Sequence, residues 1–166
     1  AGFLRYSLDR QPTEMAALTA ELDAQRKYLA IEQTRFDDRL KVNFNIEPGL
    51  ENARLPSLIL QPILENAIKY AITPRTDGGS IDVSAFREGD TLKIRIEDDG
   101  PGLPSSDAMP RRPGVGLANA RERLELIYGE RAGLTARNRD PHGCRVDIWL
   151  PLEEDRVGRT TAPALS

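Results

Sequence analysis

A segment rich in proline and glycine, residues 100–116, constrains the fold of this chain more than any other feature. It contains four prolines and four glycines, and prolines at this density exclude a regular helix or a central strand. A run of alternating apolar residues precedes it, and an apolar pattern of helical period follows it. A loop of this length within a compact domain is usually functional or disordered. The sequence therefore predicts a long, lid-like loop between a strand and a helix.

Periodicity predicts the elements on either side of this loop. Helical spacing of apolar residues occurs in three segments, residues 12–36, 56–72 and 117–128. Alternation predicts five strands, at residues 42–47, 81–85, 92–96, 134–139 and 144–150. This order favours an α+β fold, a two-layer α/β sandwich with a mixed five-stranded sheet and three helices on one face. We expect residues 12–152 to form this domain, residues 1–11 to be the remnant of a helix or linker, and residues 153–166 to be a disordered tail.

Composition narrows the possible functions. The 166 residues carry a formal net charge of −3, which argues against a domain that wraps nucleic acid. The single cysteine, Cys144, and the single histidine, His142, exclude an intramolecular disulfide and metal sites built from several of either residue, although carboxylate sites for Mg²⁺ remain open. No apolar run reaches the ~18–20 residues of a membrane span. The start without Met suggests a fragment whose missing part could hold a membrane anchor.

The expected second helix has a polar face that allows two interpretations. Gln61, Glu65, Asn66 and Lys69 cluster on one side, opposite its apolar residues. In the first interpretation this face is solvated, and Glu65 and Lys69 form an ion pair one turn apart. In the second, the Asn66 carbonyl is one ligand of a Mg²⁺ whose other ligands are phosphates. The helix alone does not decide between them.

The expected strand 92–96 leads into the sequence Glu97-Asp98-Asp99-Gly100-Pro101-Gly102. Alternation places Asp98 on the inward, apolar face, where a carboxylate is costly unless it is hydrogen-bonded. It could cap the following turn. It could instead accept a hydrogen bond from a ligand amine, which would favour adenine over guanine because an ionised carboxylate only accepts. Gly100 and Gly102 would then allow the backbone to approach the ligand closely.

A third candidate element is Gly114-Val115-Gly116-Leu117, which leads directly into the expected third helix. Free amides at a helix N-terminus favour phosphate groups, although a Gly-x-Gly alone is weak evidence because glycine commonly ends loops. Arg111 and Arg112 in the loop are expected to be solvated.

In this order the three elements resemble the N box, the G1 box (Asp-x-Gly-x-Gly) and the G2 box (Gly-x-Gly-Leu) of the GHKL superfamily. That superfamily contains the gyrase, heat-shock chaperone, histidine kinase and mismatch-repair ATPases. Within it, LQPILENAIKY at residues 60–70 resembles the N box of LytS/YehU-type sensor histidine kinases. Three further segments resemble signatures of that subfamily, LRYSL at residues 4–8, YLAIEQTRF at 28–36 and GVGLANARERLEL at 114–126. The resemblance spans residues 3–151.

The resemblance implies a Bergerat-type ATP-binding fold with a flexible lid, and a role for each matching residue. Asn66 corresponds to the Mg²⁺ ligand, Lys69 to a phosphate contact, and Asp98 to the adenine anchor. The glycines of the pocket floor and of the lid hinge and phosphate loop, with their neighbours, are Gly100, Gly102, Gly114, Val115, Gly116 and Leu117. Glu65 is similar to the acid that orients or deprotonates the attacking group, a role that in histidine kinases can fall to an acid beside the phosphoacceptor.

The same resemblance implies that this is the catalytic domain of a sensor histidine kinase, with ATP and Mg²⁺ bound. Its γ-phosphate would pass to a histidine on a missing upstream dimerisation domain and then to a response regulator, often one of LytTR type. The parent would be a homodimer in the bacterial inner membrane with this domain in the cytoplasm. The family's Pro-His-Phe-type phosphoacceptor motif would lie upstream of residue 1, and His142, in an expected hairpin turn, is not expected to replace it. The alternatives are a non-catalytic ATP-sensing module and a hydrolysing GHKL ATPase.

Overall fold

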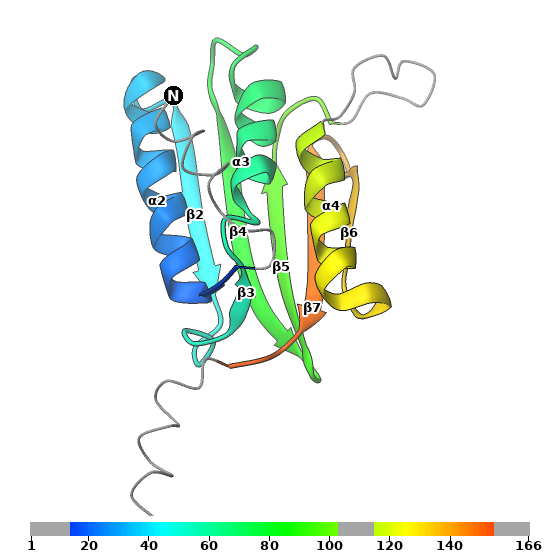
Figure 1. Cartoon of the computed structure of the whole chain (residues 1–166). Helices are drawn as coiled ribbons and strands as arrows, with labels where there is room; N and C mark the ends of the chain where they lie inside the picture. Colours follow the sequence, from blue (N-terminus) through cyan, green and yellow to red (C-terminus); the bar gives the residue numbers. More distant parts are fainter. Residues whose placement is uncertain (1–13, 103–114, 155–166) are drawn as a thin grey trace, which may run out of the picture.

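The computed structural model describes residues 14–102 and 115–154, which form a layer of helices packed on a sheet (Figure 1). In chain order the elements are β1 (Met15–Ala17), α2 (Leu18–Arg35), β2 (Leu40–Ile46), β3 (Arg54–Pro56), α3 (Gln61–Ala67), a π-helical turn η1 (Ile68–Ile72), β4 (Gly79–Glu88), β5 (Thr91–Asp98), α4 (Val115–Tyr128), a 3₁₀ turn η3 (Gly129–Arg131), β6 (Gly133–Asn138) and β7 (Cys144–Pro151).

The main sheet has five strands in the order β2-β4-β5-β7-β6. Only β2 and β4 run parallel, because the crossover through α3 joins them, and the other pairs are antiparallel. The helices α2, α3 and α4 all cover the same face of this sheet (Figure 1). The predicted mixed five-stranded sheet with three helices on one face is therefore confirmed.

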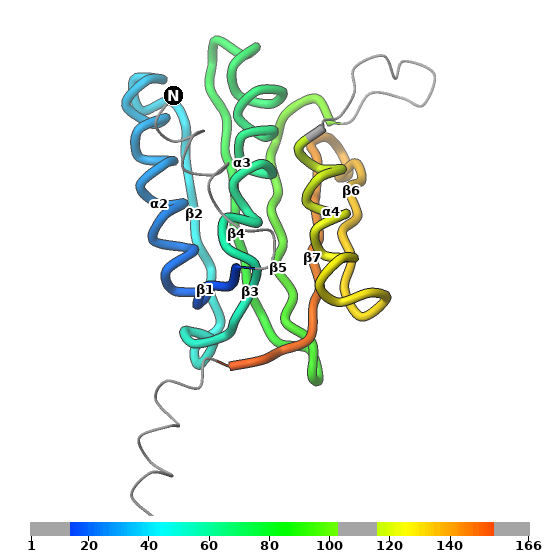
Figure 2. The backbone as a smooth tube through the Cα atoms, viewed as in Figure 1, coloured from blue at the N-terminus to red at the C-terminus, as the bar shows by residue number. Residues whose placement is uncertain are grey.

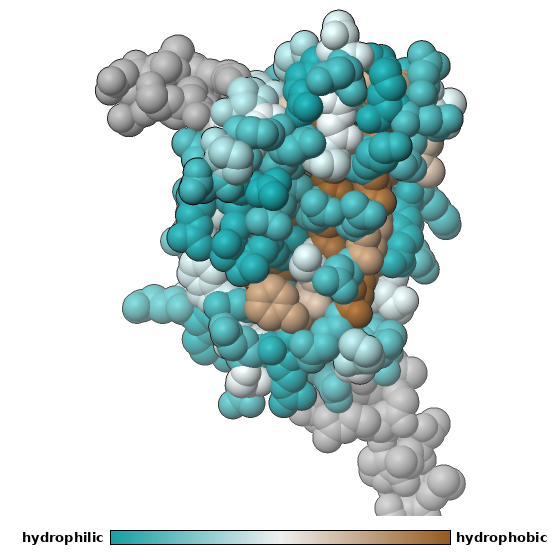
Figure 3. Space-filling model, turned by 180° about the vertical axis from the view of Figure 1, so that it is seen from behind, coloured by the Kyte–Doolittle hydropathy of each residue, from teal (hydrophilic) through white to brown (hydrophobic). Residues whose placement is uncertain are grey.

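The core lies between the two layers and follows the predicted periods. Along β5, Leu92, Ile94 and Ile96 point into it, and each is at most 3% exposed. Along α2, Leu18 and Leu29 of the predicted stripe are at most 1% exposed. The opposite face of the sheet, seen from behind in Figure 3, is mostly hydrophilic with an apolar strip. One-sided burial of this kind is what alternation along an antiparallel strand produces.

The first helix begins later than predicted. Residues Met15–Ala17 are extended and pair with Arg54–Pro56 as an antiparallel two-stranded sheet beside the start of α2 (Figure 2). The N–H of Leu18 then donates to the Ala53 carbonyl at 2.7 Å. Pairing with a distant segment thus replaces the first helical turns, a tertiary effect that local periodicity does not contain.

The second helix is also shorter at its start and irregular at its end. Pro56 belongs to β3, a turn follows in which Leu58 has a φ of 59°, and α3 begins only at Gln61. From Ile68 the helix widens into the π turn η1, where the Thr73 N–H donates to the Ile68 carbonyl at 2.9 Å. Single π turns within helices occur frequently at functional sites.

Several expectations concern residues outside the described ranges. They are the remnant at residues 1–11, all of the lid except its ends, including Gly114, Arg111 and Arg112, and most of the tail 153–166. Across the described part of the chain, none of the helices has both the length and the apolar character needed to cross a bilayer.

Candidate functional site

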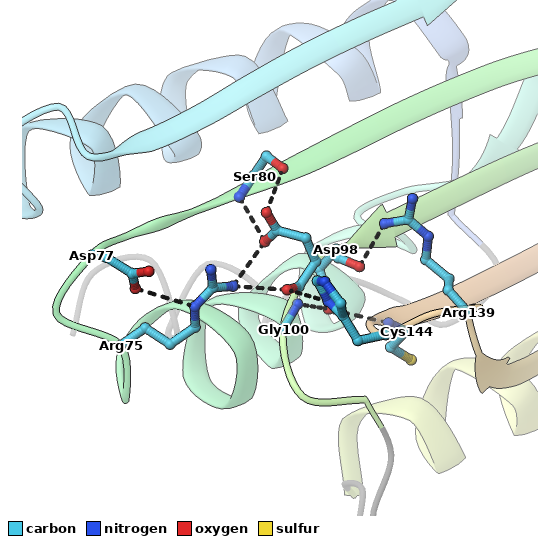
Figure 4. Close-up of polar contacts among 9 residues, drawn as sticks. Arg75, Asp77, Ser80, Asp98, Gly100, Arg139 and Cys144 are labelled. Atoms are coloured by element: carbon cyan, nitrogen blue, oxygen red, sulfur yellow. Dashed lines mark hydrogen bonds and ion pairs between the residues drawn. The ribbon is translucent and has the colours of Figure 1, made fainter.

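Asp98 is the last residue of β5 and lies, as predicted, on the inward face of the sheet, where it is only 7% exposed. Its Oδ1 accepts two backbone hydrogen bonds, from Gly100 N at 3.0 Å and from Cys144 N at 3.2 Å (Figure 4). Within residues 14–102 and 115–154, no hydrogen bond is made to its Oδ2. One carboxylate oxygen is therefore fixed by the fold, and the other accepts no hydrogen bond from the described residues.

Burial governs the electrostatics of this carboxylate. Desolvation raises the pKa of Asp98 above its ordinary value, although the backbone N–H groups of Gly100 and Cys144 and the charge of Arg139 act in the opposite direction. The charge of Asp99 raises the pKa of Asp98 further. A carboxylate whose charged form is this poorly solvated gains from any ligand that brings it another N–H donor.

Both carboxylate oxygens of Asp99, the next residue, accept hydrogen bonds from other residues of the protein. Its Oδ1 accepts from Arg75 Nη1 and from Ser80 N, both at 2.9 Å, and its Oδ2 accepts from Ser80 Oγ at 3.0 Å (Figure 4). Burial alone would raise the pKa of Asp99, but the bonds from Ser80 and Arg75 lower it below its ordinary value. The Arg75 guanidinium also donates to the Asp99 carbonyl at 2.8 Å. The two adjacent acids thus differ: both oxygens of the Asp99 carboxylate accept hydrogen bonds from the protein, whereas only Oδ1 of Asp98 does so among the described residues.

The turn between β6 and β7 covers the same strand end. Arg139 Nη1 donates to the Asp98 carbonyl at 2.7 Å, and His142 Nδ1 lies 3.1 Å from the Asp99 carbonyl. Gly143 has a φ of 110°, and a Cβ on it would lie 2.1 Å from the Asp98 carbonyl oxygen. His142 is an exposed turn residue, as predicted, but it lies beside the Asp98–Asp99 pair. The sequence analysis missed Arg75, Arg139 and this turn as parts of the site, and Gly143 was their only local signal.

Gly100 and Gly102 lie in the segment that follows β5. A Cβ on Gly100 would lie 2.5 Å from the Cβ of Ala71 in η1, so only glycine allows this close packing. Gly102 has a φ of 91°, and a Cβ there would lie 2.6 Å from the Asn138 side-chain oxygen. The glycines therefore let α3–η1 and the β6–β7 hairpin close on the end of β5, where the sequence predicted a pocket floor.

The four polar residues predicted to share one face of the second helix differ in their exposure to solvent. Glu65 and Lys69 are exposed and Asn66 is half-buried, but Gln61 is only 3% exposed. Gln61 Nε2 donates to Glu65 Oε2 at 2.9 Å, which holds the Glu65 carboxylate. Lys69 lies in η1, its Nζ 5.2 Å from the centre of the Tyr70 ring. Among the described residues, no ion pair joins Glu65 to Lys69, so the ion-paired version of a solvated face is not formed.

The glycine-rich element before the third helix is described only in part. Gly114 lies outside the described residues, and α4 already begins at Val115, two residues earlier than predicted. A Cβ on Gly116 would lie 3.0 Å from the Pro62 Cβ, so Gly116 lets the start of α4 pack closely against α3. Leu117 is buried at 6% exposure. Gly116 and Leu117 therefore join the two helices, in addition to any contact with a ligand.

The donor groups present fit a magnesium ion better than a transition metal. Among residues 14–102 and 115–154, no group of three or more His, Cys, Asp and Glu side chains could hold a metal. The helix α3 instead carries two consecutive residues with oxygen donors, Glu65, which is exposed, and Asn66, which is half-buried. Oxygen donors in small number suit Mg²⁺, which keeps water and phosphate ligands, and do not suit Zn²⁺ or copper.

The comparison with known families agrees with this geometry. Residues 51–154, which carry α3, Asp98 and the strands β4, β5, β6 and β7 of the main sheet, match the family described as "Histidine kinase-, DNA gyrase B-, and HSP90-like ATPase". The chain belongs to this ATPase family. Residues 1–40 match a second family, described as "Histidine kinase". The chain corresponds to the catalytic ATP-binding domain of the sensor histidine kinases, as the resemblance of its motifs implied.

Individual relatives support this placement. The chain is 34% identical over 158 residues to the Bacillus subtilis sensor histidine kinase YesM. This match covers 94% of this chain and 27% of that protein. It is 33% identical over 162 residues to the Escherichia coli sensor histidine kinase YpdA, covering 93% and 28%. The Staphylococcus aureus sensor histidine kinase/phosphatase LytS is 34% identical over 143 residues, covering 80% and 24%. The chain therefore spans about a quarter of the length of these relatives.

Solved structures show the same fold. The catalytic domain of the histidine kinase ThkA superposes with a TM-score of 0.65 at 15% identity, covering 84% of this chain and 95% of that one. The mycobacterial sensor histidine kinase MprB gives a TM-score of 0.62 at 20% identity, covering 86% and 99%. At these identities the likeness concerns the fold of an ATPase of this family.

Proposed function

We propose that this domain binds Mg–ATP and donates the γ-phosphate to a histidine on an upstream dimerisation domain, as the catalytic part of a sensor histidine kinase. The observation that carries the proposal is Asp98, a buried carboxylate with one oxygen fixed by Gly100 and Cys144 and the other open. Oδ2 accepts a hydrogen bond from the adenine amino group. Guanine has a carbonyl at that position, which an ionised carboxylate repels, so the site prefers adenine.

The phosphates are assigned to the α3–η1 face and the start of α4. Lys69 is exposed in η1 and contacts phosphate as a flexible cation, and Asn66 supplies the amide oxygen that holds Mg²⁺. Bound there, Mg²⁺ neutralises charge on the phosphates. The lid glycines Gly114 and Gly116, with Val115 and Leu117, bring backbone N–H groups at the N-terminus of α4 to the phosphate end. The pocket floor is Gly100 and Gly102.

Transfer of the γ-phosphate depends mainly on positioning and charge neutralisation, so the domain needs little further chemistry of its own. Glu65 is exposed, is held by Gln61, and orients or deprotonates the incoming histidine. His142 is not the acceptor, because its Nδ1 lies 3.1 Å from the Asp99 carbonyl, at the end of the site assigned to the base. The acceptor lies on the upstream dimerisation domain.

The remaining assignments follow from the family. We assign residues 12–152 to the ATP-binding domain. The assignments of residues 1–11 to a dimerisation helix or linker and of residues 153–166 to a tail fall mostly outside the described residues. The parent is a homodimer anchored in the bacterial inner membrane with this domain in the cytoplasm. Its partners are its own phosphoacceptor domain and a response regulator of LytTR type, and it makes no direct contact with nucleic acid.

Two measurements test the proposal. The first is thermal unfolding with Mg–ATP, which should stabilise the domain by roughly 2.7 kcal/mol at a hundredfold excess over Kd, or about 5–10 °C. Mg–GTP should do much less, and Asn66→Ala should remove the dependence on Mg²⁺. Equal shifts with ATP and GTP would contradict the adenine assignment.

The second is transfer of radiolabel from ATP, with this domain alone and with the upstream dimerisation domain added. We expect label only in the mixture, on the upstream histidine, in acid-labile and base-stable form. Label on the isolated domain that His142→Ala removes would refute the assigned acceptor. ATP binding without transfer in either mixture would indicate a non-catalytic ATP sensor, and release of phosphate alone would indicate a hydrolysing ATPase.

A further inference from the structure

We propose that Arg139, in the turn between β6 and β7, is a positioning residue that sets the base preference of the nucleotide site by orienting Asp98 and holding it in its acceptor form. The inference rests on the proposed binding of adenine by Asp98. It adds a residue that lies 41 positions away in the sequence and belongs to none of the recognised motifs.

The contact itself is the first argument. Arg139 Nη1 donates to the main-chain carbonyl of Asp98 at 2.7 Å, so a charged donor is hydrogen-bonded to the backbone of the proposed anchor residue (Figure 4). Its Nε lies 3.5 Å from Glu97 Oε2, which fixes the guanidinium from the preceding residue of β5. The Arg139 side chain is about one-third exposed, at 31%. A hydrogen bond from a charged group in such a half-buried place is stronger than a neutral one.

The turn that carries Arg139 also holds the Asp98 carboxylate. The Arg139 N–H donates to the Gly143 carbonyl at 2.9 Å, which closes the turn. Gly143 packs against the Asp98 carbonyl, and the next residue, Cys144, donates its N–H to Asp98 Oδ1 at 3.2 Å. Arg139 therefore joins the backbone of Asp98 to the segment that orients its side chain, and its loss would loosen both.

Charge is the second argument. The charged or titratable groups around Asp98 are Asp99 on the same strand end, Arg139 on the β6 side and the Cys144 thiol on β7. Arg75 and His142 contact Asp99 and, among the described residues, make no direct hydrogen bond to Asp98. Arg139 is the cation whose charge acts on Asp98 and lowers its pKa against the effect of burial.

Ionisation matters for the choice of base. Ionised Asp98 only accepts hydrogen bonds and suits the adenine amino group, whereas protonated Asp98 can donate to the guanine carbonyl. Without Arg139, Asp98 takes up a proton at a higher pH. ATP affinity should then fall, and GTP should compete better, as the pH is lowered.

The chain offers a matched control for the test. Arg137, two residues earlier on β6, is 63% exposed, and its Nη2 lies 3.9 Å from Asp147, so Arg137→Gln removes the same charge without touching Asp98. We would measure the Kd of ATP and of GTP for the wild type, R139Q and R137Q from pH 8 to pH 5.5. Protonation of the ligand phosphates is common to all three proteins and cancels in the comparison.

We expect R139Q to bind ATP at least about fivefold more weakly than R137Q at pH 8, from the loss of one charged hydrogen bond. The ratio should grow as the pH falls, and the preference for ATP over GTP should shrink. The conservative variant R139K keeps the cation, so it should lose affinity but retain a pH dependence close to that of R137K. This second pair carries the test if R139Q does not fold.

The outcomes separate the inference from the function on which it rests. If the wild type binds ATP and R139Q matches R137Q in affinity, pH dependence and base preference, the role of Arg139 is refuted while the proposed function stands. A loss of ATP affinity in R139Q that is constant with pH and equal for GTP would also refute it, because it would indicate a purely structural contact. Absence of ATP binding by the folded wild type would refute both.

Discussion

Glu21 gives the sharpest test of how this fold positions α3, the helix that carries Asn66. This residue of α2 is 2% exposed, and its carboxylate accepts the N–H of Leu58 at 2.7 Å and the N–H of Leu60 at 3.0 Å. Leu60 precedes the first residue of α3 and does not cap that helix with its own side chain. The unsatisfied N–H groups at a helix start need acceptors, and here a carboxylate from another helix supplies them.

The expected cost follows from these two bonds. A hydrogen bond to a charged group contributes about 1.5–3 kcal/mol, so Glu21→Ala should lower the free energy of unfolding by about 3–5 kcal/mol. Glu21→Gln keeps one acceptor but places an amide N–H₂ against a backbone donor, and should cost about half as much. For a domain of this size a loss of about 5 kcal/mol corresponds to a fall in Tm of about 10–20 °C.

Urea unfolding followed by circular dichroism would measure these values, with Asp23→Asn as the control on the same helix. Asp23 is 66% exposed, and its carboxylate lies 3.9 Å from Arg26, so this ion pair contributes less than about 1 kcal/mol. The order should be E21A, then E21Q, then D23N close to the wild type. A value for E21A within about 1 kcal/mol of D23N would refute the argument that Glu21 caps α3.

Three further predictions follow from the site and the sheet. Because burial raises the pKa of Asp98, its charge destabilises the empty fold above that pKa, and the penalty disappears as the pH falls through it. Asp98→Asn should therefore melt at or above the wild-type temperature at pH 7 without ligand, lose that advantage at acidic pH, and lose the shift produced by Mg–ATP. Gly100→Ala should cost about 1–3 kcal/mol in urea unfolding and weaken ATP binding, because its Cβ would lie 2.5 Å from that of Ala71. Gly133→Ala should cost a similar amount, since its Cβ would lie 2.3 Å from the Trp149 ring, and Trp149→Leu in the same chain should recover part of the loss in a double-mutant cycle.

The sequence predicted the sheet and the inward position of Asp98 well because both depend on period-two alternation. Leu92, Ile94, Ile96 and Asp98 lie on one face in the structure as they do in the pattern. The same logic failed at the helix boundaries. Met15–Ala17 pairs with Arg54–Pro56, a segment about forty residues away in the sequence. A local pattern does not predict pairing with so distant a segment.

The surroundings of Asp98 could not be predicted for a related reason. Arg75 and Arg139 are ordinary charged residues in the sequence, and their role depends on the close approach that Gly100 and Gly143 allow. Gln61 was placed on the polar face by its helical angle, yet it is buried because α3 is covered on more than one side. A single helical period describes one buried stripe and does not describe a helix packed against two neighbours.

The junction around β3 has a consequence for how the ends of the domain are connected. On one side β3 pairs with β1, through which the chain enters the described domain, and on the other the Arg54 N–H donates to the Glu153 carbonyl at 2.6 Å, just beyond β7. Both ends of the described domain are therefore hydrogen-bonded to the same short strand. Only four residues separate β3 from α3. The strand that joins the two ends thus leads directly into the helix bearing Asn66.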